Sequence, residues 1–227
     1  MPKNKIHLAI IPDGNRRWAK KKLLKPWEGH QQALDNSRAL IEWCRQEPRI
    51  ATLTLWGFST ENWDRSPEEI SQLMRIFEQY LKDERKQITA NKTRFIHSGR
   101  LDRLPPSLAH LISDIATETK DNNDFTFNLA LDYGGRDEII RTIRKIPAAQ
   151  HKDIDETTIR AYFDHPELPD IDLVIRTSGE YRTSGFFIWQ TAYTEWIFET
   201  KLYPEITPHD LEGYIKEYDN RHRRFGR

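Results

Sequence analysis

The sequence predicts a single α/β domain, spanning residues 1–227, with a central, mostly parallel β-sheet flanked by helices. Short apolar segments rich in β-branched residues alternate along the chain with longer amphipathic segments. A length of 227 residues suits one domain with a sizeable core. Polar clusters follow directly after four of the expected strands, at 13–17, 59–62, 132–136 and 176–180. Ligands of parallel sheets bind beyond the carboxyl ends of strands, so these clusters predict one shared site.

The N-terminal half predicts three strands and two helices. Ile6–Ile11 is an apolar run that ends at a Pro-Asp-Gly-Asn turn signal. Residues 29–46 carry apolar side chains at helical spacing, and residues 52–58 are β-branched and aromatic. Pro67–Ala90 begins with a proline and two glutamates, which favour a helix start, and 93–97 is the next strand.

The C-terminal half continues the alternation. The expected elements are a helix over 108–119, a strand over 125–131, a helix from about Asp137, a strand at Leu173–Arg176, a further short strand over 187–189 and a helix over 208–218. Crossover connections of this kind place successive strands parallel to one another. The chain ends in a basic segment.

Composition and charge exclude several classes of function. The 35 Lys and Arg residues balance 35 Asp and Glu residues, and this zero net charge argues against a nucleic-acid-binding protein. A lone Cys44 cannot form an internal disulfide, which favours a reducing, cytoplasmic compartment. The N-terminal apolar run is too short for a signal peptide, and no stretch approaches 18 apolar residues. Transient contact with a membrane surface stays open.

The first polar cluster, Asp13-Gly14-Asn15-Arg16-Arg17, has the makings of an anion site. Backbone N–H groups of a glycine turn and two arginines can cradle an anion, and the aspartate can hold a divalent cation. The plainer alternative is a turn with solvated charges. The segment lacks the pattern of a P-loop.

Two further segments have both a functional and a structural interpretation. Gly29-His30 stands at the expected start of a helix, where the imidazole could contact phosphate, transfer a proton or make only a local hydrogen bond. Residues 58–65 bring hydroxyl, amide and guanidinium groups directly after a buried strand. The alternative for this segment is a helix cap formed by Ser59 or Thr60.

The C-terminal third adds cationic and acidic groups. Arg176 and Arg182 stand six residues apart with hydroxyl side chains nearby, which suits a diphosphate, although surface salt bridges would look similar. Glu195 lies among aromatic residues, so it is either paired or metal-bound when buried, or it faces solvent. The 221–226 segment is either a disordered basic tail or an arm over a phosphate site. Together the clusters predict a ligand consisting of a diphosphate with Mg²⁺.

Several ordered blocks resemble the cis-prenyltransferase family, the undecaprenyl diphosphate synthase-like (Z)-isoprenyl diphosphate synthases. They are HLAIIPDGNRRWA at 7–19, GH at 29–30, LTLWGFSTENW at 53–63, YGGR at 133–136, DLVIRTSGE at 172–180 and RRFG at 223–226. The resemblance spans nearly the whole chain. It implies a homodimer with a hydrophobic tunnel, which condenses isopentenyl diphosphate with an allylic diphosphate primer in the presence of Mg²⁺. The product would be a (Z)-polyprenyl diphosphate.

The resemblance also implies roles for individual residues. Asp13 would organise Mg²⁺ with Glu195 as a second carboxylate, and Asn62 belongs to the motif linked to condensation and proton removal. The primer diphosphate would contact Gly14, Asn15, Arg16, Arg17, Trp18, Lys25, His30 and Arg65. The diphosphate of isopentenyl diphosphate would contact Arg176, Arg182, Thr183 and Ser184. Phe58 and Trp63 would flank the prenyl chain, with Ser59, Thr60 and Glu61 beside them, and Arg223 would complete the neighbouring subunit's site.

The chain departs from the family pattern at three positions. Pro26 stands where many members carry an arginine for the primer diphosphate, and the adjacent Lys25 offers a point charge without the bidentate fork. Arg100 replaces a common Asp, and Gly185 replaces a common Asn. These departures bear on affinity and primer choice more than on the class of reaction.

The sequence gives only weak indications of the chain length of the product. Phe125 stands where long-chain members carry a smaller residue, so its ring could cap the tunnel, whereas Gly57 argues against a short tunnel. We expect a short- or medium-chain product. The alternatives are an undecaprenyl-type carrier-lipid synthase, a non-catalytic subunit of a heteromeric prenyltransferase, an unrelated phosphate-binding enzyme, and a head-to-middle coupling enzyme, against which Asn15 argues.

Overall fold

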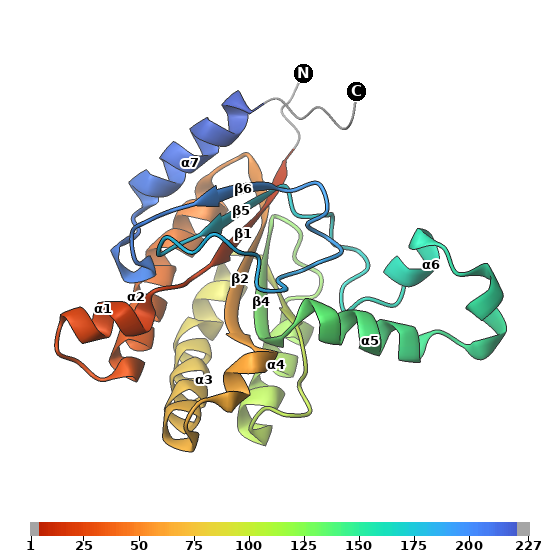
Figure 1. Cartoon of the computed structure of the whole chain (residues 1–227), viewed down its shortest axis with the longest axis horizontal. Coiled ribbons are helices and arrows are strands. Elements are labelled where there is room, and N and C mark those ends of the chain that lie inside the picture. The colour runs from red at the N-terminus through yellow and green to blue at the C-terminus, as the bar shows by residue number, and fades with distance from the viewer. Residues whose placement is uncertain (1–4, 222–227) are drawn as a thin grey trace.

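Six parallel strands form the centre of the molecule. The computed structural model describes residues 5–221. The strands are β1 (Ile6–Ile11), β2 (Ile50–Ser59), β3 (Thr93–Ser98), β4 (Phe125–Tyr133), β5 (Leu173–Arg176) and β6 (Glu195–Phe198). They form one sheet in the order β3-β4-β2-β1-β5-β6, and every neighbouring pair is parallel. The predicted α/β class is thereby confirmed (Figure 1).

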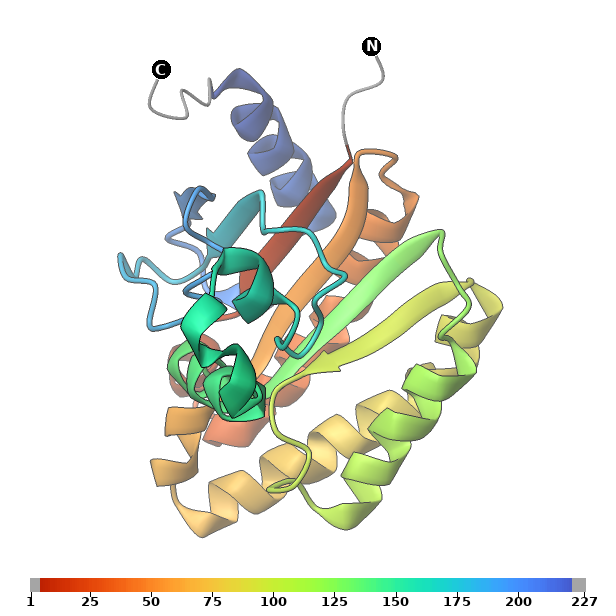
Figure 2. The same cartoon turned by 90° about the vertical axis from the view of Figure 1, so that its right-hand side faces the viewer.

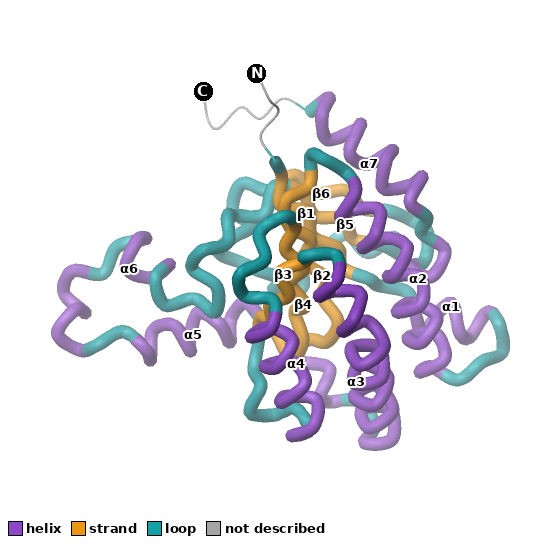
Figure 3. Tube along the Cα trace, turned by 180° about the vertical axis from the view of Figure 1, so that it is seen from behind, coloured by secondary structure: helices purple, strands orange, loops and turns teal. Residues whose placement is uncertain are grey.

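Helices connect the strands and cover mainly one face of the sheet. They are α1 (Asn15–Lys21), α2 (Pro26–Gln46), α3 (Pro67–Ala90), α4 (Pro106–Glu118), α5 (Gly135–Lys145), α6 (Glu156–Arg160) and α7 (Pro208–Asn220), with 3₁₀ segments at Thr60–Asp64, Ala148–Asp153 and Tyr203–Glu205. Helices α2, α3, α4 and α7 form one layer (Figure 3), and α3 lies beside α4 (Figure 2). By contrast, α5 and α6 extend away from the body as an arm (Figure 1). In the part of the chain that the structure describes, no helix is long and apolar enough to span a membrane.

Successive side chains of β1 point to opposite faces of the sheet, so the strand contributes to a separate apolar core on each face. Leu8 and Ile10 join the larger core under the helical layer, where they are almost fully buried. Ala9 and Ile11 join a smaller core on the opposite face, which includes Phe186 from the loop after β5. Both faces of the strands are therefore apolar, as is usual for parallel sheets.

A chain of hydrogen bonds between buried side chains crosses four strands on that opposite face. Ser98 donates to the Asn128 carbonyl at 3.0 Å, and the Asn128 amide donates to the Thr54 hydroxyl at 3.2 Å. The Thr54 hydroxyl lies 2.7 Å from His7 Nε2, and His7 Nδ1 lies 3.0 Å from the Pro169 carbonyl. The carbonyl can only accept, so Nδ1 carries a proton. Burial lowers the pKa of His7 to about 4, so near pH 7 the imidazole is neutral and its Nε2 accepts from the Thr54 hydroxyl.

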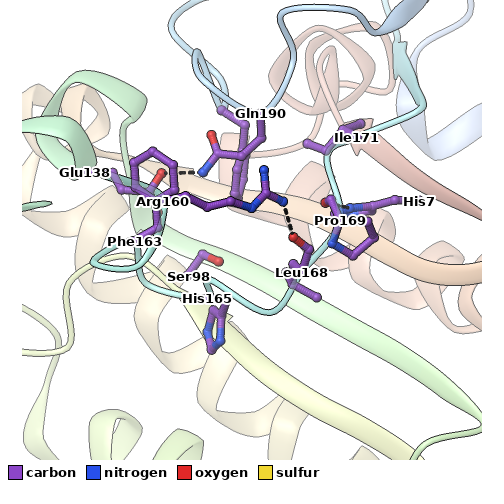
Figure 4. Close-up of a pocket in the computed structure, with 11 residues that line it drawn as sticks. His7, Ser98, Glu138, Arg160, Phe163, His165, Leu168, Pro169, Ile171 and Gln190 are labelled. Atoms are coloured by element: carbon purple, nitrogen blue, oxygen red, sulfur yellow. Dashed lines mark hydrogen bonds between the residues drawn. The ribbon is translucent and has the colours of Figure 1, made fainter. Parts of the chain in front are cut away.

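A small polar cavity lies at the end of this chain of hydrogen bonds (Figure 4). Its volume is about 10 Å³, which leaves room for no more than a water molecule. Glu138 lies in its wall and accepts hydrogen bonds from the Tyr133 hydroxyl at 2.6 Å and from the Gln190 amide at 3.0 Å. Burial raises the pKa of Glu138 above its ordinary value. The cavity is too small for a prenyl substrate, so the substrate site lies elsewhere.

The prediction of a short strand over 187–189 is wrong, and the strand at this edge of the sheet is β6 instead. Phe187 has a left-handed φ of 39°, so its residue turns rather than extends. Its ring stacks on Tyr133 with centroids 4.0 Å apart. The aromatic run therefore covers the sheet face and does not pair with a strand. The apolar run that suggested a strand indicates only that these side chains are buried, and side chains of a folded loop can be buried as well.

Two helices were not predicted, and a third begins earlier than expected. Helix α1 starts directly after Gly14, where only a turn was expected, and α6 lies in the arm. Helix α2 begins at Pro26, with the proline at its first position. Gly29 and His30 therefore lie inside the helix and do not mark its start.

Candidate active site

The strand order itself creates a crevice at the carboxyl edge of the sheet. Strand β1 lies between β2 and β5, and the chain leaves β1 toward β2 before it returns on the other side as β5. Ligands bind at such topological switch points. A cavity of about 390 Å³ lies there, and its lining includes Pro12, Asp13, Asn15, His30, Phe58, Ser59, Glu61, Asn62, Arg65, Arg176 and Ser184. Ten of the residues predicted for catalysis and binding, half of the predicted set, thus line one cavity.

Asp13 and Arg176 form the charged centre of this cavity. Arg176 Nη2 donates to Asp13 Oδ2 at 2.9 Å, and the other Asp13 oxygen accepts the Gly14 backbone N–H at 2.7 Å. Arg176 is 4% exposed, and its Nη1 donates to the Ser184 hydroxyl at 2.8 Å. Among the described residues its Nε is buried without a partner. The guanidinium is therefore held in place and keeps one donor unused.

Gly14 allows the chain to turn sharply behind Asp13. Its φ is 100°, and a Cβ atom there would lie 2.8 Å from both a Leu202 methyl and the Ser178 Cβ. Only glycine fits both the conformation and the space. The turn places the Asp13 carboxylate and the start of α1 on the same side of the cavity.

Asn15 and Gly29 fix the approach of α1 to α2. The Asn15 amide donates to the Pro12 carbonyl at 3.0 Å and lies 3.4 Å from His30 Nδ1. A Cβ atom on Gly29 would lie 2.1 Å from the Asn15 carbonyl oxygen, so the two helices touch at a glycine. Asn15 Oδ1 is buried without a partner among residues 5–221. A buried unpaired oxygen at a cavity wall is a natural acceptor for a ligand or its water.

His30 and Arg65 form a second polar pair in the wall. Arg65 Nη1 lies 3.4 Å from His30 Nε2 and 3.2 Å from the Glu69 carboxylate. Burial, together with the nearby Arg65 and Arg16 cations, lowers the pKa of His30 to about 3. The imidazole is therefore neutral near pH 7, so it can position groups by hydrogen bonding without adding a charge. Glu69 is itself 5% exposed and also faces Arg16, 3.8 Å away.

Asn62 and the aromatic pair Phe58 and Trp63 shape the wall after β2. The Asn62 carbonyl oxygen accepts the Ser59 backbone N–H at 3.1 Å. Trp63 packs edge-on against Phe58, with centroids 5.2 Å apart, and its indole N–H donates to Asp132 at 2.8 Å. An amide in this bonding arrangement holds the segment in place and is no proton acceptor.

The remaining predicted residues surround the cavity at greater distance. Arg17 donates to the Ser178 carbonyl at 3.0 Å and to Glu180 at 2.9 Å, and Arg182 pairs with the same glutamate. The Lys25 ammonium lies 4.9 Å from the Trp27 ring centroid. Trp18 and Thr60 are half-buried, and Thr183 is exposed. Arg223 lies outside the described residues.

Glu195 is not brought to Asp13 within one chain. It opens β6 and pairs in register with Leu173, which in turn pairs with Leu8. Asp13 follows the carboxyl end of β1, whereas Glu195 stands at the amino end of β6, two strands to the side. Glu195 instead accepts a hydrogen bond from Arg221 at 3.1 Å. The sequence could not show this separation, because both residues adjoin strands, but Asp13 follows the carboxyl end of its strand and Glu195 stands at the amino end of another.

The residues present fit a magnesium ion that is carried by a diphosphate. In the described part of the chain, no three carboxylate, histidine or cysteine side chains gather as a metal site. The Asp13 side chain is 31% exposed and still has lone pairs to offer, and Arg176 has an unused donor beside it. Magnesium is commonly held by one or two carboxylates together with substrate phosphates. Asp13 alone would be the protein's ligand from this chain.

Sequence reasoning missed the supporting residue Glu69, and it placed Ser178 and Asp132 in polar clusters without giving either a role. Glu69 lies four residues after Arg65, a spacing that could have indicated the ion pair. Ser178 accepts a hydrogen bond from Arg17 on its hydroxyl at 2.6 Å. Asp132 is fully buried and accepts hydrogen bonds from Trp63 and Arg103. No local pattern marks the last two as partners, because their contacts are made across the fold.

An apolar cavity continues from the polar one between α2, α3 and the sheet. The two share Pro12, Asn15, His30 and Gly57. The continuation, about 40 Å³, is lined mainly by Ala33, Leu34, Leu55, Leu73, Ile76, Phe77, Tyr80, Phe127 and Leu129. Tyr80 and Phe127 also line a third cavity of about 200 Å³ at the far side. A polar mouth therefore leads into an apolar passage, and Tyr80 and Phe127 are common to the walls of this passage and of the third cavity.

Comparison with known proteins gives a consistent result. The family model described as "Putative undecaprenyl diphosphate synthase" matches residues 11–226. The chain is 40% identical to an isoprenyl transferase of Aquifex aeolicus, over 97% of this chain and 95% of that protein. It is also 40% identical to a tritrans,polycis-undecaprenyl-diphosphate synthase (geranylgeranyl-diphosphate specific) of Thermococcus kodakarensis, over 97% and 86%.

Two solved structures share this fold closely. A lavandulyl diphosphate synthase from Lavandula x intermedia, in complex with dimethylallyl diphosphate, superposes with a TM-score of 0.92 at 37% identity, covering 97% of this chain and 98% of that one. A structure described as a probable undecaprenyl diphosphate synthase from Campylobacter jejuni gives a TM-score of 0.83 at 32% identity, with both chains fully covered.

Proposed function

Since this chain belongs to the undecaprenyl diphosphate synthase family and is a prenyl transferase, we propose that the cavity around Asp13 joins isopentenyl diphosphate to an allylic diphosphate. The observation that carries this is the junction of two environments. A mouth with Asp13 and Arg176 opens into an apolar passage lined by residues such as Leu55 and Phe77. A prenyl diphosphate has the same division between a charged head and an apolar chain.

The reaction can be written on these residues. The allylic C–O bond to diphosphate breaks, the alkene of isopentenyl diphosphate attacks the allylic carbon, and a new C–C bond forms. A proton is then lost beside the new bond, which restores a double bond in the product. Arg65 stabilises the negative charge on the departing diphosphate of the primer, and Arg176 holds the diphosphate of isopentenyl diphosphate. When Mg²⁺ is bound, it neutralises diphosphate oxygens, with Asp13 as its ligand.

The proton goes to a diphosphate oxygen. The Asn62 carbonyl is occupied by the Ser59 N–H, and an amide is a poor base. His30 is neutral, but the acidic shift of its pKa to about 3 makes it a weak base. The role of Asn62 is therefore to position the segment that faces the substrates. The arrangement of both substrates in the narrow cavity decides the cis geometry.

We propose that the chain acts as a homodimer. Ile140 and Ile143 on α5 are each 49% exposed, and Ile154 and Ile188 expose 38% and 40%. The two α5 residues lie three positions apart, so they share a face of the arm. An apolar face of this kind suits a second copy of the chain. Sedimentation of the native chain and of an Ile143→Asp variant would test this, with a shift from dimer to monomer expected.

We propose a product of short or medium length, limited by Tyr80 and Phe127. Both residues line the apolar cavity and the third cavity beyond it. Phe125, the cap suggested by the sequence, is 2% exposed and is not among the residues lining either cavity. A prenyl product also has an apolar chain that must leave water, so we propose transient contact with a membrane surface.

One experiment tests the reaction. The purified chain is incubated with Mg²⁺, labelled isopentenyl diphosphate, and dimethylallyl, geranyl, farnesyl or geranylgeranyl diphosphate in turn. Products are separated by chain length and double-bond geometry, and a cis-extended product is expected. Branched coupling of two dimethylallyl units would contradict the proposed reaction. No incorporation with any primer, with Asp13→Ala identical to the native chain, would point to a non-catalytic subunit.

A further inference from the structure

The hairpin between α1 and α2 carries an unusual surface. The ten residues 16–25 read RRWAKKKLLK, with six basic residues and no acidic one, in a chain whose net charge as a whole is zero. Leu23 at the tip is 96% exposed and its neighbour Leu24 is 41% exposed. The loop protrudes from the body beside α1 (Figures 1 and 3). We call residues 20–25 the basic tip.

The lysines of the basic tip do not serve the fold through ion pairs. Arg16 and Arg17 form ion pairs with Glu69 and Glu180, respectively. In contrast, Lys20, Lys21, Lys22 and Lys25 form no salt bridge with any residue from 5 to 221, and all four are exposed. Four uncompensated cations on one protruding loop attract an anionic surface.

Leu23 occupies a position where a helix end normally uses glycine. The Leu23 N–H donates to the Lys20 carbonyl at 3.1 Å, and the Leu24 N–H donates to the Ala19 carbonyl at 2.9 Å. This is the hydrogen-bond pattern of a Schellman cap, whose left-handed residue is usually glycine. Leu23 has a φ of 58° and so carries an apolar side chain in a conformation that disfavours it. The fold alone therefore gives no reason for a leucine here.

We propose that the basic tip docks the enzyme on an anionic phospholipid bilayer, with Leu23 inserted below the headgroups and the lysines among them. Apolar residues flanked by lysines are the arrangement that binds at a membrane interface. A bilayer supplies both the negative charge that the lysines require and the apolar layer that the leucine requires. A soluble acidic protein would satisfy only the lysines.

The basic tip lies close to the mouth of the cavity, which suggests why the enzyme would dock there. This part of the argument rests on the proposed function. Helix α1 runs from Asn15 to Lys21, so the basic tip begins within about 9 Å of Asn15 along the helix axis. Asn15 and His30 line both the polar mouth and the apolar passage. Docking would thus bring the mouth of the cavity close to the bilayer, which is the phase that accepts a prenyl chain.

Binding can be tested without substrate. The native chain is sedimented with vesicles of phosphatidylcholine containing 30% phosphatidylglycerol, and with vesicles of pure phosphatidylcholine. We expect binding to the anionic vesicles that weakens as salt is added, and little binding to the neutral ones. Leu23→Gly should lower the partition coefficient about tenfold, because one buried leucine is lost. Lys21→Gln with Lys22→Gln should lower it by roughly twentyfold, at about fivefold for each charge.

Matched controls separate docking from folding. Lys92 is an exposed residue with a φ of 52° at the opposite edge of the sheet, so Lys92→Gly relieves a similar backbone conformation and should leave vesicle binding unchanged. Leu23→Gly should melt no lower than the native chain, because glycine suits the left-handed cap. Leu23→Asn, which also tolerates that conformation, should lose vesicle binding as Leu23→Gly does.

Three results would overturn the proposal. They are absence of native binding to the anionic vesicles at low salt, equal binding to neutral vesicles, or native-like binding of Leu23→Gly. A condensation assay in detergent solution, without vesicles, tests the proposed function separately from membrane docking. Leu23→Gly should retain its turnover there, whereas a native chain that binds vesicles through Leu23 but condenses no substrate would contradict only the proposed function.

Discussion

Arg176 donates a hydrogen bond to the Asp13 carboxylate at 2.9 Å, although 163 residues separate them in the sequence. The pair forms because β1 and β5 are adjacent and parallel, with Ile11 in register with Arg176. Each residue thus reaches the cavity from the carboxyl end of its own strand. The cation and the carboxylate hold one another while each keeps capacity for a ligand.

We expect Asp13→Asn to reduce kcat/KM by about a hundredfold or more, because the site loses the carboxylate that would hold the metal and the diphosphate. The melting temperature should fall as well, since asparagine has only one acceptor oxygen for the Gly14 N–H and Arg176 and leaves the buried guanidinium without its charge partner. Steady-state condensation of labelled isopentenyl diphosphate measures the first, and thermal unfolding the second. Asp170→Asn, in an exposed ion pair with Arg160, is the matched control and should keep native activity.

Arg176→Lys keeps the charge but loses the planar fork that serves Asp13 and Ser184 together. We expect a loss of activity of roughly tenfold to a hundredfold, with a lower melting temperature because the site is buried. Arg85→Lys, in an exposed pair with Glu118, changes the same groups at the surface and should have little effect. Equal behaviour of the two variants would contradict the assigned role of Arg176.

Gly29→Ala should damage both stability and activity. The new Cβ would lie 2.1 Å from the Asn15 carbonyl, so α1 and α2 must separate at the cavity. We expect a loss of about 1–3 kcal/mol in the free energy of unfolding, typical of overpacking. Gly213→Ala, where a Cβ meets nothing within 4 Å, is the control in another helix. Denaturant unfolding of the two variants would show whether the helix contact carries the effect.

Substitution of Phe127 should change product length. Phe127→Leu removes part of the ring that lines both cavities, and we expect longer products from the same primer. Phe125→Leu removes a similar ring from the core on the same strand and should leave the length distribution unchanged. Chromatography of the dephosphorylated products decides between them. The reverse pattern would favour the cap at Phe125 that the sequence suggested.

Acid should destabilise the fold partly through His7. Burial lowers the pKa of His7 to about 4, from an ordinary value of 6.5. Between these values the unfolded state binds more protons than the native state, so stability falls as pH drops from about 6.5 toward 4. Protonation of His7 lowers the free energy of unfolding by about 3 kcal/mol below pH 4, and it has no effect on that free energy above pH 6.5.

The measurement for His7 is denaturant unfolding at several pH values. His7→Gln lowers stability at pH 7 because the bonds to Thr54 and Pro169 are lost or altered. Its further decline between pH 6.5 and 4.5 should nevertheless be shallower than that of the native chain. Parallel declines in the two proteins would show that His7 does not titrate as its burial implies.

Much of the fold could be read from periodicity. The strands Ile6–Ile11 and Leu173–Arg176 and the helix Pro67–Ala90 have the predicted bounds, because each pattern is local and long or strongly apolar. The strand expected over 187–189 failed, since Phe187 packs its ring on Tyr133 from a turn. Burial alone does not tell a folded loop from a strand.

The sequence by itself determined the alternation of strands and helices, the residues able to bind a diphosphate, and the family resemblance. These follow from residue types and short spacings, which the chain carries in linear form. Only the tertiary structure decided which of those residues meet. Strand order and register bring Arg176 to Asp13 but leave Glu195 at the amino end of β6, away from the carboxyl end of β1 that Asp13 follows. Contacts between distant segments depend on the packing of the whole sheet, and no local pattern encodes that packing.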